Sequence, residues 1–441
     1  MVETEAEAKK SFRPPLYVRV VLGVALGAAL GASFGDREIL FGWKNSDLAK
    51  IGSLYIRFLT ALATPLIFFA ILDAFVRTTI SGRQGLKLLI VCGINIAVAF
   101  AIGLGILNFF RPGETWKGEL TERAAAARSS REASTPSASG KSNEPSLSIL
   151  AILDSYVPKN IAQPFSENMV LTIAVLAILI GAAARSLEPN DDGTISEALV
   201  SYKHLVIASF QIVLKLLTWV IELAPYAICL VVAGVVGGTE NLGALLSRVG
   251  IFFATVIAAL SVHALVYYPL SSWFIGGVSP QALFREAAGA ILTGFSINSS
   301  LATAPLTLKA LDRMGVSESS ARLSACVGTN FNNDGITLYE AITALFVAQA
   351  AGMEMHFAQQ ISILLAALVG SMGIAGIPNS GLIILALVLK AARLPDEIVD
   401  LALPIVYSID FINARIRSAV NVMGDIQVAI LLDAGKSKRS N

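Results

Sequence analysis

The segment TNFNNDGITLY, residues 329–339, places four Asn or Asp side chains within one of the most apolar parts of the sequence. The chain as a whole has 441 residues, of which 55% are hydrophobic. Unpaired polar groups in a dry interior cost several kilocalories per mole, and an isolated charge costs far more. We therefore expect this segment to be either a loop outside the core or a binding site for a solute or an ion.

The composition around this segment is that of a membrane protein. Only 15% of the residues are charged, the net charge is +1, and the mean hydropathy is +0.68. A soluble protein normally carries about a quarter charged residues. Several apolar runs are long enough to cross about 30 Å of hydrocarbon. The clearest runs are 16–34, 54–75, 88–109, 170–184, 205–236 and 249–270. The sequence predicts an all-α polytopic membrane protein.

The distribution of Lys and Arg predicts the orientation, because short cytoplasmic loops retain these residues. They precede the first apolar run, separate the second run from the third, and lie at the end of the chain. We expect a multi-pass protein of the cell membrane with a cytoplasmic N-terminus (1–14) and a cytoplasmic tail (435–441). The polar segment 111–147 is also basic, but long loops follow the rule poorly, and we expect a disordered extracellular loop there.

Other function classes find little support. The three Cys lie in apolar segments, the three His are scattered, and we find no zinc spacing, phosphate-binding loop or nucleophile motif. We therefore do not expect an enzyme or a nucleic-acid partner. The expected partners are a small solute and membrane lipid.

The second half of the chain is interrupted where the first half is continuous. Non-helical backbone at membrane depth survives only when it is buried in protein or lines a wet cavity. Breaks in two corresponding places are the best pointer to a transporter's binding site. The breaks are SINSSLATAP (296–305), GTNFNNDGI (328–336), GSMGIAGIPNSG (370–381) and NVMGD (421–425). We expect two re-entrant hairpins, at 284–312 and 360–392, each followed by a spanning helix. Two kinked helices in a structural core are the alternative.

The last apolar segment, YSIDFINARIRSAVNVMGD (407–425), is unusually polar. Asp410, Arg417, Asn421 and Asp425 are separated by seven, four and four residues, so they share one face of a helix. Charges within a membrane are costly and are functional by default. A buried Asp–Arg structural pair would account for two of these residues but not for the whole stripe.

The four interrupted motifs resemble the dicarboxylate/amino acid:cation symporter family. NNDGITLYEA is similar to the family's Asn-Met-Asp-Gly-Thr signature, the serine-rich and GIAGIPNSG segments look like two hairpin tips, and ARIRSAVNVMGD looks like the eighth helix. The resemblance implies eight transmembrane helices plus two re-entrant hairpins, assembled as a homotrimer with an elevator mechanism. It assigns 15–77 and 148–237 to a static scaffold. It assigns 78–110 (helix three) and 238–434 to a mobile transport domain.

The same resemblance implies sodium as the coupling ion. Sodium is a hard cation and takes oxygen ligands from carboxylates, amides and backbone carbonyls. The central site would use the Gly328 carbonyl, Asn332, Asn421 and Asp425. Asp334 would serve a second sodium, and the backbone at Asn330, Ser371 and Ile374 would form a site beneath the second hairpin. By a looser alignment, Cys92, Asn95 and Ile96 occupy the places of helix-three residues that serve another sodium site.

The resemblance also places the substrate. Arg417 matches the arginine that pairs with the substrate's side-chain carboxylate, for which its bidentate fork is suited. Ser300, Ser418 and Asn421 sit where the family holds the main-chain carboxylate. The hairpin tips would add N–H groups. The tips contain Ser299 on the first hairpin and Gly376, Pro378 and Gly381 on the second.

Several positions depart from the family pattern. Ile336 replaces a threonine that helps to select an acidic side chain, and Ala414 replaces the aspartate that holds the substrate's amino group. Arg415, and the absence of an arginine from the first hairpin tip, are features of the animal excitatory amino acid transporters. Glu340 matches their glutamate linked to protons, since burial disfavours the charged form of a carboxyl group. A pair between Glu340 and Arg415 is the alternative.

These residues predict a secondary active symporter that brings a small carboxylate-bearing solute, such as an acidic or other amino acid, into the cell with sodium. Protons are a further candidate coupling ion through Glu340. A C4-dicarboxylate carrier is the alternative within transport, favoured by Ala414. An anion-conducting channel of the same fold and a non-transporting receptor or scaffold also remain open.

Overall fold

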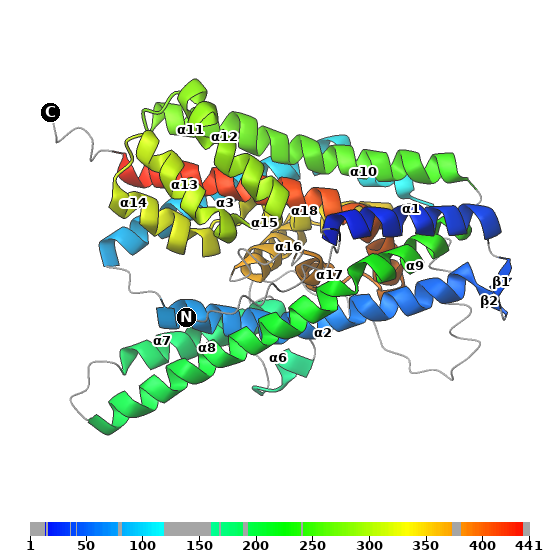
Figure 1. The fold of residues 1–441 in the computed structure, drawn as a ribbon, viewed down its shortest axis with the longest axis horizontal. Coiled ribbons are helices and arrows are strands. Elements are labelled where there is room, and N and C mark those ends of the chain that lie inside the picture. Colours follow the sequence, from blue (N-terminus) through cyan, green and yellow to red (C-terminus); the bar gives the residue numbers. More distant parts are fainter. Residues whose placement is uncertain are drawn as a thin grey trace, which may run out of the picture.

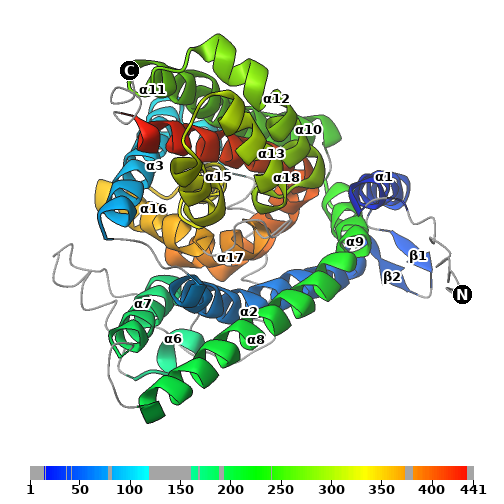
Figure 2. The same ribbon diagram turned by 60° about the vertical axis from the view of Figure 1, so that its left-hand side comes forward.

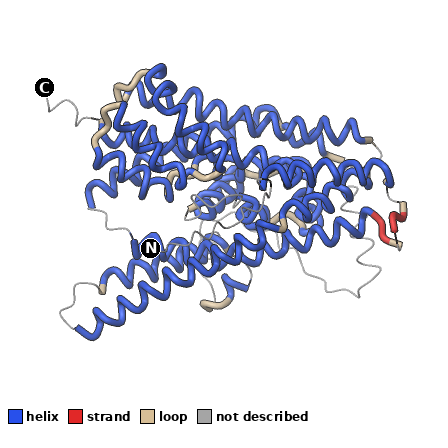
Figure 3. The backbone as a smooth tube through the Cα atoms, in the orientation of Figure 1, coloured by secondary structure: helices blue, strands red, loops and turns tan. Residues whose placement is uncertain are grey.

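The computed structural model describes residues 14, 16–35, 37–40, 42–77, 82–118, 160–166, 169–187, 193–239, 241–372 and 381–434. The predictions made for 435–441, for nearly all of 1–14 and for most of 111–147 therefore lie outside the described residues. Nearly all of the described chain is helical, and two short strands pair near one end of the molecule (Figure 3).

Most of the first half of the chain forms one group of helices and a small ribbon, whereas the helices of residues 82–116 pack against the second half. The elements are α1 (Leu16–Phe34), β1 (Glu38–Leu40), β2 (Trp43–Lys44), α2 (Asn45–Arg77), α3 (Gly82–Phe110), the short 3-10 helix η1 (Pro112–Trp116), α6 (Gln163–Ser166), α7 (Val170–Ser186), α8 (Gly193–Glu222) and α9 (Ala224–Gly237). The ribbon is antiparallel. Helices α2, α7 and α8 lie together as a layer beside the rest (Figure 2).

Glycines bring α1 and α9 into close contact. A Cβ atom on Gly23 would lie 2.3 Å from the carbonyl oxygen of Pro225, and one on Gly27 would lie 2.3 Å from that of Cys229. Small residues four positions apart allow this approach, which is a common way to pack helices in membranes. The apolar run 205–236 had been predicted as one element but is divided at Leu223 between α8 and α9. Pro225 explains the break, because proline is favoured in the first turn of a helix and not in its interior.

The second half of the chain surrounds one buried helix. Its elements are α10 (Leu242–Val262), the π-helical turn η2 (His263–Tyr267), α11 (Tyr268–Phe274), α12 (Pro280–Ile297), α13 (Ser300–Arg313), α14 (Glu318–Arg322), the π-helical turn η3 (Leu323–Val327), the 3-10 turn η4 (Gly328–Asn330), α15 (Asp334–Ala350), α16 (Phe357–Ser371), α17 (Gly381–Ala391) and α18 (Asp396–Asp433). All but one residue of α15 is buried, and this helix packs against α3, α16 and α18 (Figure 1).

Two packed helix pairs occupy the ranges where hairpins were predicted. Helix α12 packs against α13, and α16 packs against α17. The turn of the first pair is made by Asn298, whose φ of 53° is left-handed, a conformation that Asn tolerates better than most residues. Ser299 then caps α13 by accepting a hydrogen bond from the Ala302 N–H at 3.2 Å. The turn of the second pair lies outside the described residues.

Among the described residues, four helices are long and apolar enough to cross a membrane. They cover Asn45–Asp73, Arg83–Phe110, Glu197–Glu222 and Leu242–Phe274. Shorter apolar helices cover Val18–Phe34, Thr172–Ser186, Ala224–Gly237 and Phe357–Ser371. The helical, apolar architecture agrees with the expected class of membrane protein.

Candidate functional site

The polar segment that precedes α15 lies against the polar face of α18. Asn333 and Asp334 are buried on one side, and Asn421 is buried on the other. The Asn421 side chain joins the two, because its Oδ1 accepts from the Gly335 N–H at 2.8 Å and its Nδ2 donates to Asn333 Oδ1 at 3.3 Å. The two polar stretches that the sequence singled out therefore meet in one core, through bonds between residues 86 and 88 positions apart.

Two glycines make this meeting possible. A Cβ atom on Gly335 would lie 2.6 Å from the Arg417 carbonyl oxygen and 2.9 Å from Asn421 Oδ1. A Cβ atom on Gly381, at the start of α17, would lie 2.7 Å from Arg417 Nη2. Larger side chains at either position would push α15 or α17 away from α18.

Arg417 belongs to the same group of buried polar residues on α18 and around the start of α15, which is called the cluster below. Its guanidinium donates from Nη1 to Asp410 Oδ1 at 2.6 Å and from Nη2 to Asp410 Oδ2 at 3.2 Å, and its carbon lies 4.0 Å from the centre of the Tyr339 ring. The side chain is only 2% exposed. The Asp–Arg pair that the sequence left as an alternative is therefore present. A guanidinium has five N–H donors, so the pair with Asp410 does not use its full capacity.

The turn of the first helix pair adjoins this cluster. Ser418 donates to Asn298 Oδ1 at 2.8 Å, and the hydroxyl oxygens of Ser300 and Thr329 are 3.3 Å apart. Ser299 and Ser300 are buried. The serines predicted to bind a carboxylate are thus brought beside Arg417's helix by the tip of α12–α13.

The second helix pair is connected to the cluster through Ser371. Its carbonyl oxygen accepts from Asn333 Nδ2 at 2.8 Å, and its hydroxyl oxygen lies 2.6 Å from that of Thr337. Ile374, Gly376 and Pro378, predicted as ion and substrate contacts, lie outside the described residues.

Two carboxylate oxygens in the cluster are buried without a hydrogen-bond partner among the described residues. They are Asp334 Oδ1 and Asp425 Oδ1. Buried polar atoms are nearly always satisfied, so such atoms require an explanation such as a bound ion. Carboxylate oxygens suit a hard cation, and the donor set of this core therefore fits sodium. The predicted Gly328 carbonyl oxygen accepts hydrogen bonds from the N–H groups of Phe331 and Asn332, both at 2.8 Å, so it would have to coordinate an ion in addition to these two donors.

The other oxygen of Asp334 is held by residues that the sequence analysis did not identify. Oδ2 accepts from the Tyr268 hydroxyl at 2.8 Å and lies 3.1 Å from His263 Nε2. His263 is fully buried in the π-helical turn η2, a feature frequently found at functional sites. The three His had been interpreted as unrelated, because the 71 residues between His263 and Asp334 hide the contact.

A buried amide network joins α3 to the same core. Asn95 Nδ2 donates to Asn332 Oδ1 at 3.1 Å and to Gln427 Oε1 at 2.8 Å, and the Tyr267 hydroxyl donates to Asn95 Oδ1 at 2.8 Å. The looser alignment of helix three had pointed to Asn95, and the structure places it beside Asn332. Gln427 was missed, although it follows Asp425 by only two residues.

Three further predicted positions are also buried. Both carboxyl oxygens of Glu340 lack a hydrogen-bond partner among the described residues, so the structure gives no support to a pair with Arg415. Arg415 instead donates to the Phe411 carbonyl oxygen at 3.2 Å. Ile336 is 9% exposed and Ala414 is 2% exposed, so both present apolar surface in the core.

Comparison with known proteins identifies related transporters. The model of the sodium:dicarboxylate symporter family matches residues 16–434. The chain is 28% identical to the human (Homo sapiens) neutral amino acid transporter B(0), over 86% of this chain and 72% of the transporter. It is 26% identical to human excitatory amino acid transporter 3, over 85% and 76% of the two chains. It is also 31% identical to an excitatory amino acid transporter of Caenorhabditis elegans, over 61% and 51%.

Proposed function

Since the chain belongs to the sodium:dicarboxylate symporter family, we propose that it carries a small carboxylate-bearing solute into the cell together with sodium. Members of this family are transporters and not enzymes, and the relatives are named as amino acid transporters. The activity is secondary active symport, in which the sodium gradient drives uptake of the solute.

The observation that carries the proposal combines a buried arginine with two carboxylate oxygens that have no hydrogen-bond partner in the described part of the chain. Asp425 and Asp334 supply negative charge for cations, and Arg417 supplies a fork for a carboxylate. All three lie on or beside the α15–α18 contact. Binding of the ion stabilises the core that the solute needs, which is the physical basis of coupling.

The remaining ion and substrate roles follow the sequence analysis. Ser300, Ser418 and Asn421 hold the second carboxylate of the solute, and the tips of the two helix pairs close over it. Ser371 and Asn330 belong to an ion site beneath the second tip. Glu340 is the candidate proton carrier, because it is buried and neither of its carboxyl oxygens has a hydrogen-bond partner among the described residues.

A C4-dicarboxylate carrier is the second candidate function. Ala414 offers no charge for an ammonium group, and Asp410 is already held by both Nη atoms of Arg417. An α-amino group in this core would therefore lack a carboxylate partner, which is costly for a buried charge. This favours a solute with two carboxylates, or one whose amine lies elsewhere.

The arrangement of the helices supports an elevator mechanism. Residues 15–77 and 148–237 form the scaffold, and 78–110 with 238–434 form the transport domain. Helices α1 and α2 both pack against α9, and the bundle that surrounds α15 meets this group mainly through α17 on α2 and α18 on α9 (Figure 2). The assembly is a homotrimer of eight transmembrane helices and two re-entrant hairpins per chain, with both termini in the cytoplasm.

Sodium-dependent binding tests the proposal directly. In Asp425→Asn the ligand carboxylate loses its charge and keeps its shape, so sodium affinity measured by thermal shift should fall at least tenfold. Asp396→Asn is the matched control, because Asp396 is an exposed aspartate of the same helix α18. Unchanged sodium affinity in Asp425→Asn would remove Asp425 from the ion site.

A further inference from the structure

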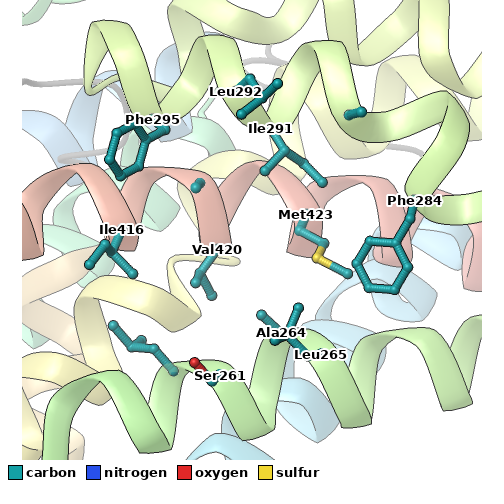
Figure 4. A pocket seen from close by; sticks show the side chains of 13 residues that line it. Ser261, Ala264, Leu265, Phe284, Ile291, Leu292, Phe295, Ile416, Val420 and Met423 are labelled. Atoms are coloured by element: carbon teal, nitrogen blue, oxygen red, sulfur yellow. The ribbon is translucent and has the colours of Figure 1, made fainter. Parts of the chain in front are cut away.

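An apolar groove lies on the opposite side of α18 from the site. It is a cavity of about 460 Å³ between α12, α18 and the junction of α10 with η2 (Figure 4). Leu265 lines it from η2, Phe284 and Phe295 from α12, and Val420 and Met423 from α18. Every lining residue is apolar except Ser261. The groove therefore suits a hydrocarbon and offers almost nothing to a polar ligand.

The groove opens at the depth of the hydrocarbon. Its residues from α10 and η2 lie within 260–265, in the middle part of the candidate span Leu242–Phe274. On its rim, the side chains of Leu265 and Leu292 are 58% and 65% exposed. Because the medium around the middle of a membrane span is acyl chains, these side chains face lipid and not water.

An exposed arginine follows the residue at one end of the groove. The groove follows α12 from Phe284 to Phe295, about 16 Å at 1.5 Å per residue. Beside Phe284 is Arg285, whose side chain is 71% exposed, and Arg285 and Arg313 both bond to the single carboxylate of Glu286. Two arginines and one glutamate leave a net charge of +1 there. Trp273, 49% exposed at the end of α11, is of the type enriched at the membrane interface.

We propose that this groove holds one acyl chain of an anionic phospholipid whose phosphate contacts Arg285. The apolar length matches a chain that enters from the adjacent leaflet, and the positive end complements the headgroup. Val420 lines the groove while its neighbour Asn421 belongs to the candidate site, so the lipid supports the back of the helix on which the solute and ion residues lie. The proposal goes beyond transport, and its test needs neither sodium nor solute.

The test is native mass spectrometry of the full chain, delipidated and then titrated with phosphatidylglycerol or phosphatidylcholine. Ala288 lines the groove and is exposed, so Ala288→Phe fills it without a clash in the core. We expect this variant to lose the tightest phosphatidylglycerol, with at least a tenfold lower affinity. Ala25→Phe, on the exposed side of α1, is the matched control and should bind as the unmutated chain does.

The headgroup contact is tested by Arg285→Gln. We expect the variant to bind both lipids with equal affinity, whereas the unmutated chain prefers phosphatidylglycerol. Arg322→Gln is the control, because Arg322 is a similarly exposed arginine paired with Glu318 on α14. If Ala288→Phe binds phosphatidylglycerol as tightly as the unmutated chain does, the groove is not the acyl-chain site. If Arg285→Gln still prefers phosphatidylglycerol, Arg285 does not bind the phosphate.

Discussion

Replacing Asp410 with asparagine should lower the thermal stability of the solute-free protein and raise its affinity for anions. Asp410 and Arg417 are 1% and 2% exposed and meet at 2.6 Å and 3.2 Å. At an effective dielectric constant of about 20, charges at these distances attract by about 5–6 kcal/mol. Breaking a buried pair by removing one partner costs about 3–5 kcal/mol, because the remaining charge is left uncompensated.

The loss of the Asp410 charge should destabilise the solute-free protein, and a bound carboxylate should restore part of the lost stability. In Asp410→Asn a carboxylate solute becomes the only counter-charge for Arg417, so its affinity should rise at least tenfold, which is about 1.4 kcal/mol. The melting temperature without solute should fall, and the rise in melting temperature on adding solute should exceed that of the unmutated protein.

The assay is calorimetry of solute binding in saturating sodium, together with a thermal melt of each variant. Asp396→Asn, exposed at the start of the same helix, should leave both quantities unchanged. The reasoning is refuted if Asp410→Asn melts as the unmutated protein does and binds the anion no more tightly, since Arg417 would then not depend on Asp410.

Four other substitutions test three separate parts of the account. Ala414→Asp should raise the affinity for L-aspartate at least tenfold and lower that for succinate, measured by calorimetry; tight aspartate binding by the unmutated chain would show that position 414 has been misinterpreted. Glu340→Gln should stop proton movement during uptake while preserving solute exchange, and alkalinisation outside vesicles that persists in the variant would exclude Glu340 as the carrier. His263→Gln should lower the sodium affinity about tenfold in a thermal-shift titration, because Asp334 loses a group that orients its carboxylate. Tyr268→Phe should give a smaller change in the same titration. If neither variant changes the sodium affinity, the contact of His263 and Tyr268 with Asp334 has only a structural role.

Much of the fold, and the contact between α15 and α18 at the site, could be predicted from local sequence. The steps of seven and four from Asp410 to Asp425 determine one helix face, and polar residues within apolar sequence must find partners. For that reason the contact between α15 and α18 was predictable. The family resemblance is likewise confirmed by the match over residues 16–434.

The contacts that were missed depend on tertiary packing. His263 reaches Asp334 across 71 residues, and Gln427 reaches Asn95 across 332 residues. No periodicity within one helix encodes such a pair. The break between α8 and α9 was different, because Pro225 was a visible signal inside the run 205–236. The sequence also left the Asp410–Arg417 pair open, since residues seven apart can share a face without bonding.

Uptake into proteoliposomes under an imposed sodium gradient tests the central claim most directly. Purified protein is reconstituted, and radiolabelled L-aspartate and succinate are offered with sodium outside and choline inside. The account predicts that at least one of these carboxylates accumulates above its outside concentration, that the accumulation is lost when choline replaces sodium outside, and that Asp425→Asn abolishes it while Asp396→Asn does not. Uptake that only equilibrates, at the same rate with and without the sodium gradient, would contradict sodium-driven symport and indicate a channel of the same fold.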